Sequence, residues 1–146
     1  MRDASRSKLV DGRYLLDTNI VIALLNGDAG VLTNLSSASE VFVPAVALGE
    51  LFFGAAKSGR AAENIERVQE FAAGRTIVSC DLHVAREYGR VKWRLKAKGR
   101  PIPENDIWIA AAALHHGLTL VTRDTHFGEV EGLRLSDWAA ETASGL

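Results

Sequence analysis

Four acidic residues are the most informative residues of this chain, and each stands beside an apolar run or at the start of a predicted helix. They are Asp17, Glu50, Asp106 and Asp124. A carboxylate in apolar surroundings is unfavourable unless a cation meets it. If folding brings all four together, a divalent metal ion is the natural counter-charge, and metal-assisted hydrolysis is the chemistry that such a site performs.

Electrostatic repulsion sets the scale of this expectation. Two like charges about 5 Å apart repel by roughly 3 kcal/mol at an effective dielectric constant near 20, so a cluster of ionised carboxylates is strained or shares protons. A Mg²⁺ ion relieves the strain through one or two direct carboxylate ligands and several waters. We expect Asp17 and Asp124 to bind the ion directly. Asp106 would bind or orient it, and Glu50 would hold a water molecule or a second ion.

Short apolar runs and amphipathic segments alternate along the chain. The sequence predicts strands over residues 14–16, 41–43, 76–78, 118–122 and 133–135. It predicts helices over residues 20–25, 29–38, 45–56, 60–71, 81–98 and 105–116. Such alternation is typical of an α/β domain whose parallel sheet is covered on both faces. We therefore expect one domain over residues 13–140, with tails at 1–12 and 141–146.

Two of the acids follow directly on predicted strands. Ligands of an open parallel sheet bind at the carboxyl ends of its strands, so Asp17 and Asp124 should lie at the same edge. The helix that carries Asp106 runs antiparallel to the strand after it, so its start could lie at the opposite edge. The loop over residues 101–105 would then have to fold over for Asp106 to join the other acids.

Glu50 lies in an apolar environment on its predicted helix. Its neighbours three and four residues away are Val46, Ala47, Phe53 and Gly54. A glutamate on such a face lines a polar pocket or lies at the margin of a groove. Each acid taken alone also has an ordinary interpretation, since aspartates after strands commonly form turns or caps and those in a first helical turn complement the helix dipole. The combination of four favours a site.

Composition limits the classes of protein that the chain can belong to. It has 146 residues and a formal net charge of −1, so any nucleic-acid binding must come from a local basic patch. Its single cysteine, Cys80, excludes an internal disulfide and fits a reducing cytosol. No apolar run reaches the roughly 18 residues of a membrane span, and residues 1–13 lack the apolar core of a signal peptide. We expect a cytoplasmic protein without membrane contact.

Four segments carry a resemblance to a known family. They are Leu15-Leu-Asp-Thr-Asn-Ile-Val-Ile, Gly49-Glu-Leu-Phe-Phe-Gly, Asn105-Asp-Ile-Trp-Ile-Ala-Ala and Leu120-Val-Thr-Arg-Asp-Thr-His-Phe. In this order and spacing they resemble the PIN-domain ribonucleases, and among them the VapC-type toxins of bacterial toxin–antitoxin pairs. The resemblance extends from Tyr14 to about Trp138.

The resemblance implies a fold, an activity and partners. The fold would be a three-layer α/β domain with a central parallel sheet of about five strands flanked by helices. The activity would be RNA cleavage with Mg²⁺, which Mn²⁺ can replace, at a site formed by Asp17, Glu50, Asp106 and Asp124. Thr18 and Thr122 would support that site. The partners would be an RNA substrate, a cognate VapB-like antitoxin and a second copy of the chain in a homodimer.

An RNA-cleaving site also needs cationic contacts. The predicted helix over residues 81–98 carries Arg86, Arg90 and Arg94 along one side, and we expect this row to face the acidic site and bind substrate. The ordinary interpretation is a solvated helix whose arginine stems cover apolar surface. His126 lies close enough to Asp124 in sequence to touch the substrate.

The helix over residues 45–56 is apolar on nearly all sides, including Phe52 and Phe53. Such a helix has more apolar surface than one core contact needs. We expect one side to pack on the sheet and another to meet a partner, either the antitoxin or a second subunit.

Other functions remain to be weighed against the nuclease. A phosphatase of the haloacid dehalogenase type needs a second aspartate two residues after the first, and Asn19 occupies that position. A phospho-acceptor receiver domain needs a lysine at a late strand end, where Thr122 and Arg123 stand. The remaining alternative is a non-catalytic PIN-like module that acts through nucleic-acid or protein contacts. Four intact acids argue against it.

Overall fold

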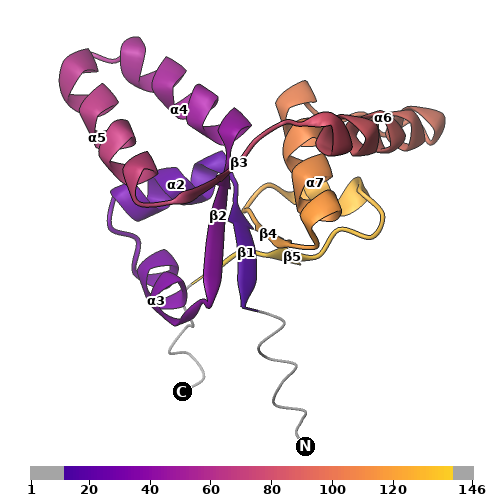
Figure 1. The fold of residues 1–146 in the computed structure, drawn as a ribbon, viewed down its shortest axis with the longest axis horizontal. Helices are drawn as coiled ribbons and strands as arrows, with labels where there is room; N and C mark the ends of the chain where they lie inside the picture. Colours follow the sequence, from indigo (N-terminus) through magenta and orange to yellow (C-terminus); the bar gives the residue numbers. More distant parts are fainter. Residues whose placement is uncertain (1–11, 140–146) are drawn as a thin grey trace, which may run out of the picture.

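The central sheet has five parallel strands in the order β3-β2-β1-β4-β5 (Figure 1). The computed structural model describes residues 12–139, so the predicted tails lie outside the described residues except for Gly12. The strands are β1 Arg13–Leu16, β2 Glu40–Pro44, β3 Thr76–Val78, β4 Thr119–Val121 and β5 Leu135–Ser136. Because Leu16 pairs with Val121, the residues that follow β1 and β4 emerge side by side at one edge of the sheet.

Helices connect the strands at the places that the sequence predicts. They are α2 Thr18–Leu25, α3 Ala29–Ser37, α4 Ala45–Ala56, α5 Ala61–Ala73, α6 Leu82–Ala97 and α7 Glu104–His116. The carboxylates of Asp17, Asp28 and Asp81 cap the first turns of α2, α3 and α6 by accepting backbone N–H groups. Gly117 ends α7 with φ of 66°, the left-handed conformation that glycine adopts without strain.

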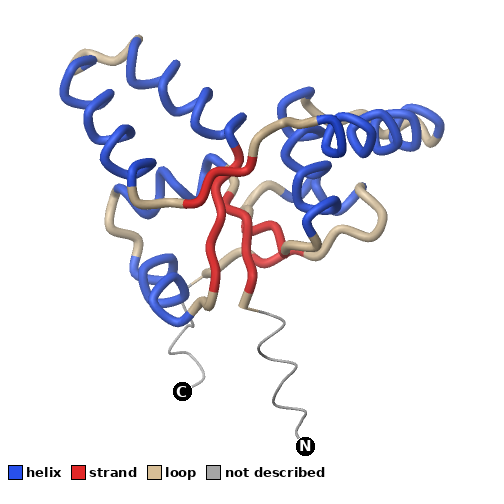
Figure 2. The backbone as a smooth tube through the Cα atoms, in the orientation of Figure 1, coloured by secondary structure: helices blue, strands red, loops and turns tan. Residues whose placement is uncertain are grey.

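Two groups of helices cover the two faces of the sheet (Figure 2). On one face α6 and α7 pack on inward side chains such as Leu15 and Leu120. On the other face α2, α3 and α5 pack on side chains such as Leu16 and Val43. Helix α4 contributes to both clusters, since Ala47 belongs to the first and Leu51 to the second. The predicted three-layer α/β architecture is therefore confirmed.

The segment after β4 differs from the prediction in two ways. The edge strand lies at Leu135–Ser136 and not at residues 133–135, because Gly132 turns the chain with φ of 83° and the N–H of Leu133 still bonds the carbonyl of Val130. The preceding residues form a 3-10 helix, η1, over Thr125–Glu129, where the sequence predicts neither a helix nor a strand. Phe127 anchors η1 in the core with no exposed surface.

Among residues 12–139, no single helix is both long and apolar enough to cross a bilayer, although the bent pair α2 and α3 would reach that length and apolar content together.

Candidate active site

The four acids predicted to form a site line one cavity of about 590 Å³, together with Thr18 and His126. Each acid comes from a different part of the fold. Asp17 follows β1, Glu50 lies in α4, Asp106 lies in the first turn of α7 and Asp124 follows β4. The cavity therefore lies at the carboxyl edge of the parallel sheet, where such folds bind ligands.

Asp17 forms the buried floor of the cavity, with 2% of its surface exposed. Its Oδ1 accepts the backbone N–H of Thr18 at 2.8 Å, and its Oδ2 accepts the hydroxyl of Thr122 at 2.7 Å. Burial nevertheless raises the pKa of Asp17 to about 6, and the charges of Asp106 and Asp124 add to the rise against the two hydrogen bonds. Both carboxylate oxygens are thus held in place, and the ionised form is disfavoured until a cation arrives.

Glu50 is held by two side chains from other helices. The hydroxyl of Thr18 in α2 donates to its Oε1 through a short hydrogen bond. The amide of Asn105 in α7 donates to its Oε2 at 3.2 Å. Ala47, which precedes Glu50 by three residues on α4, is buried in the core and has no polar group to offer it. Thr18 and Asn105 supply the polar partners of Glu50 instead.

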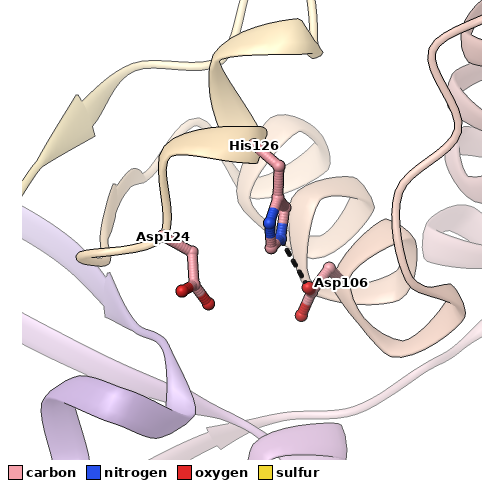
Figure 3. A group of neighbouring side chains, drawn as sticks. All are labelled: Asp106, Asp124 and His126. Atoms are coloured by element: carbon pink, nitrogen blue, oxygen red, sulfur yellow. Dashed lines mark hydrogen bonds and ion pairs between the residues drawn. The ribbon is translucent and has the colours of Figure 1, made fainter.

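Asp106 joins the other acids without any folding-over of the preceding loop, so the expectation that its helix could start at the opposite edge is wrong. A helix that runs antiparallel to the next strand must begin at the edge where that strand ends. The Nε2 of His126 lies 2.7 Å from Oδ2 of Asp106 (Figure 3). Burial raises the pKa of Asp106, and the charges of Glu50 and Asp124 act in the same direction while His126 opposes them.

The donor groups of the cavity fit a divalent cation. One ligand atom each from Asp106, Asp124 and His126 lie within 4.8 Å of one another, and Figure 3 shows the three side chains around a common space. Carboxylate oxygens are the ligands that Mg²⁺ and similar ions prefer. Asn19 also lines the cavity, and its buried side-chain oxygen has no hydrogen-bond partner in the described part of the chain. An acceptor without a donor suits a cation or its bound water.

The arginine row of α6 does not face this cavity, contrary to expectation. Arg90 and Arg94 line a separate cavity of about 670 Å³ between α6 and residues 129–132, and Arg86 lines neither cavity. Lys92 of α6 does reach the start of α7, with its Nζ 3.2 Å from a carboxylate oxygen of Glu104. Residues two apart on a helix are turned about 200° from each other, so Arg90 and Arg94 point away from the side of Lys92. Their contact with RNA stays a prediction.

Asn105 is a residue of the cavity that the sequence did not single out as functional. Its only signal was its place immediately before Asp106 at the start of a helix. Neither periodicity nor spacing relates it to Glu50, because 55 residues separate the two. Only the packing of α4 against α7 brings them into contact.

Known proteins resemble this chain over nearly its whole described length. The family model of the PIN domain matches residues 14–133. Ribonuclease VapC2 of Haemophilus influenzae is 35% identical over 129 residues, which cover 86% of this chain and 98% of the relative. The tRNA(fMet)-specific endonuclease VapC of Shigella flexneri is 32% identical over 130 residues, which cover 87% and 98%. The crystal structure of DNA-bound VapBC from Salmonella typhimurium matches with a TM-score of 0.82 at 28% identity, covering 87% and 98%.

Proposed function

Because the chain belongs to the PIN-domain family, we propose that it is an endoribonuclease that hydrolyses RNA phosphodiester bonds as the toxin of a toxin–antitoxin pair. The observation that carries the proposal is the convergence of Asp17, Glu50, Asp106 and Asp124 on one cavity, in a chain of which 86% aligns with a VapC ribonuclease. A non-catalytic PIN-like module is not favoured, because it would have no use for four carboxylates held against their mutual repulsion.

The cation proposed for the cavity is Mg²⁺, with Mn²⁺ as a substitute. Asp106 and Asp124 would hold it, since each has a carboxylate oxygen turned to the common space. Asp17 would complete the site from below, because each of its hydrogen-bonded oxygens keeps a second lone pair. When bound, such an ion supplies an activated water and positive charge for the leaving oxygen of the RNA.

The protein's own groups then have separate tasks. Thr122 and the backbone of Thr18 hold the carboxylate of Asp17 in one orientation. Thr18 and Asn105 hold Glu50 at the side of the cavity, where its carboxylate can orient a water molecule and accept a proton from it. His126 lies beside Asp106 on the side of η1. The site is therefore positioned before substrate arrives, which lowers the reorganisation that the reaction requires.

RNA is the substrate and a VapB-like antitoxin is the partner of this toxin. The name of the Shigella relative makes the initiator tRNA a candidate substrate. For the antitoxin we propose the apolar groove between α2, α4 and α5, which includes Ile22 and Leu51 and opens beside Glu50. Phe53 on the outer side of α4 is 66% exposed, so this helix keeps apolar surface for a partner. Homodimerisation and action in the cytoplasm belong to the same proposal.

Incubation of the purified protein with RNA tests the proposal. Total RNA and initiator tRNA are incubated with Mg²⁺, with Mn²⁺ and with EDTA. We expect cleavage only with metal, and none by the Asp17→Asn variant purified in the same way. The Asp81→Asn variant is the matched control, because Asp81 also caps a helix but lies outside the cavity. Equal cleavage by wild type and Asp17→Asn would assign the activity to a contaminating nuclease, and no cleavage by the pure wild type with either metal would overturn the proposal.

A further inference from the structure

His126 stands among the acids as a potential ligand of a different chemical kind. It lies in η1, two residues after Asp124, and its ring faces the start of α7 (Figure 3). Its Nε2 lies 2.7 Å from Oδ2 of Asp106, and the ligand atoms of Asp106, Asp124 and His126 all lie within 4.8 Å of one another. Asp17 and Glu50 are outside this group: Asp17 would approach the ion through the free lone pairs of its hydrogen-bonded oxygens, and Glu50 is held by Thr18 and Asn105.

These spacings match the coordination shell of a small cation. With bonds of about 2.1 Å, neighbouring ligands of an octahedral ion lie about 3 Å apart and opposite ligands about 4.2 Å apart. The separation of 2.7 Å between His126 and Asp106 corresponds to neighbouring ligands. The ligand atoms of the group lie at most 4.8 Å apart, so the most distant pair would have to approach by well under one ångström to reach the separation of opposite ligands. The carboxylate of Asp124 has no hydrogen bond to another side chain within residues 12–139, so it is free to make that movement.

We propose that His126 is a protein ligand of the cation in this site, so that Asp106, Asp124 and His126 bind it through two oxygens and one nitrogen. The proposal rests on the proposed function of the cavity as a metal site. Its consequence is metal selectivity. Mg²⁺ is a hard ion that prefers oxygen ligands, whereas divalent transition-metal ions accept imidazole nitrogen readily. The site therefore binds Mn²⁺ more tightly than Mg²⁺, and His126 is the residue that makes the difference.

A positioning role for His126 is the alternative that the experiment must exclude. The imidazole could only orient Asp106 through their hydrogen bond, as groups around a metal site commonly do. Loss of such support weakens the binding of every ion alike. Loss of a nitrogen ligand weakens Mn²⁺ and leaves Mg²⁺ nearly unchanged. The His126→Gln substitution separates the two roles, because the Gln amide can still donate to Asp106 from the position of Nε2 but removes the imidazole.

The measurements are calorimetric titrations with Mn²⁺ and with Mg²⁺, and the nitrogen hyperfine coupling of bound Mn²⁺ in electron spin-echo spectra. We expect the wild type to show nitrogen coupling and to prefer Mn²⁺. His126→Gln should lose the coupling and the preference for Mn²⁺ over Mg²⁺, with Mg²⁺ affinity retained. His115→Asn is the control for surface binding, since His115 contacts both His83 and His116 at the far end of α7. It should leave every reading unchanged.

Three results would count against this assignment in different ways. Absence of nitrogen coupling in the wild type, with both ions bound, overturns the role of His126 as a ligand. Retention of Mn²⁺ preference in His126→Gln, together with equal losses for both ions in His126→Ala, assigns His126 to positioning. Failure of the wild type to bind either ion overturns the proposed metal site itself. Unfolding curves in EDTA establish that each variant is folded before it is titrated.

Discussion

The hydroxyl of Thr122 lies 2.7 Å from Oδ2 of Asp17, so the first residues beyond β4 and β1 are joined by a buried hydrogen bond. The hydroxyl oxygen of Thr122 in turn accepts the backbone N–H of Asp124 at 3.1 Å. One hydroxyl thereby fixes the distance between two acids that are 107 residues apart (124 − 17). The arrangement of β1 and β4 thus holds the acids close together. Their repulsion should lower the free energy of unfolding of the protein without metal.

Replacing Asp17 by Asn should abolish cleavage and raise the stability of the metal-free protein. The pKa of Asp17 rises from 3.8 to about 6 on folding, so ionisation of this group favours the unfolded chain. The shift corresponds to roughly 3 kcal/mol at neutral pH as an upper value. Urea unfolding in EDTA measures the difference in the free energy of unfolding between Asp17→Asn and the wild type. A less stable Asp17→Asn protein at pH 8 would contradict the clustering of charges, and Asp81→Asn should show no gain.

The same shift predicts how the gain depends on pH. A raised pKa in the folded state means that stability from this group is full below the unfolded value of 3.8 and falls as the pH rises through about 6. The advantage of Asp17→Asn should therefore be large at pH 8 and nearly absent at pH 4. Saturating Mg²⁺ should remove it at pH 8, because the ion binds the folded wild type and offsets the repulsion.

Replacing Thr122 by Val should weaken both the fold and the site. The substitution keeps the shape of the side chain but removes the donor to Asp17 and the acceptor for the N–H of Asp124, both in a residue only 5% exposed. Unsatisfied buried groups of this kind cost about 1–3 kcal/mol. Thr122→Ser keeps the hydroxyl and should retain most of the activity and stability. Similar activities for the Val and Ser variants would show that the hydroxyl does not position Asp17.

Replacing Asn105 by Ala should lower cleavage with little effect on stability. Asn105 is exposed and its amide holds Oε2 of Glu50, which Thr18 holds from the other side. Loss of one such support commonly reduces the activity of a metal site by about 10- to 100-fold. Cleavage rates and thermal unfolding, measured on the same preparation, test whether activity falls while stability is kept. A large fall in melting temperature, with a proportional fall in activity, would assign Asn105 to the fold and not to the site.

Neutralising Lys92 should change RNA binding more than neutralising Arg94. Lys92 contacts Glu104 at the rim of the acid cavity, whereas Arg94 lines the separate cavity of α6. A phosphate contact contributes about one unit to the slope of log affinity against log salt. RNA binding is measured over a salt series in EDTA. The slope should fall by about one unit in the Lys92→Gln variant and by less in Arg94→Gln. The reverse order would restore the arginine row as the path of the substrate.

Local chemistry in the sequence determined the elements and the identity of the acids. Apolar runs, capping aspartates and Gly117 placed nearly every strand and helix within two residues, because their periodicity and caps are properties of neighbouring residues. The 3-10 helix over Thr125–Glu129 was the exception, since the burial of Phe127 shapes this segment through the tertiary structure. The acids stood out because each lies in a short motif whose residue types are themselves informative.

The tertiary structure decided which groups touch. The contacts of Glu50 with Thr18 and Asn105, and of His126 with Asp106, join elements that have no sequence relationship. The orientation of α6 also depends on tertiary packing, since its contact with α7 turns Lys92 toward the site and Arg94 away from it. A sequence records which chemical groups are present. Their distances follow from the packing of whole helices against the sheet, a sum of many weak contacts that no single motif contains.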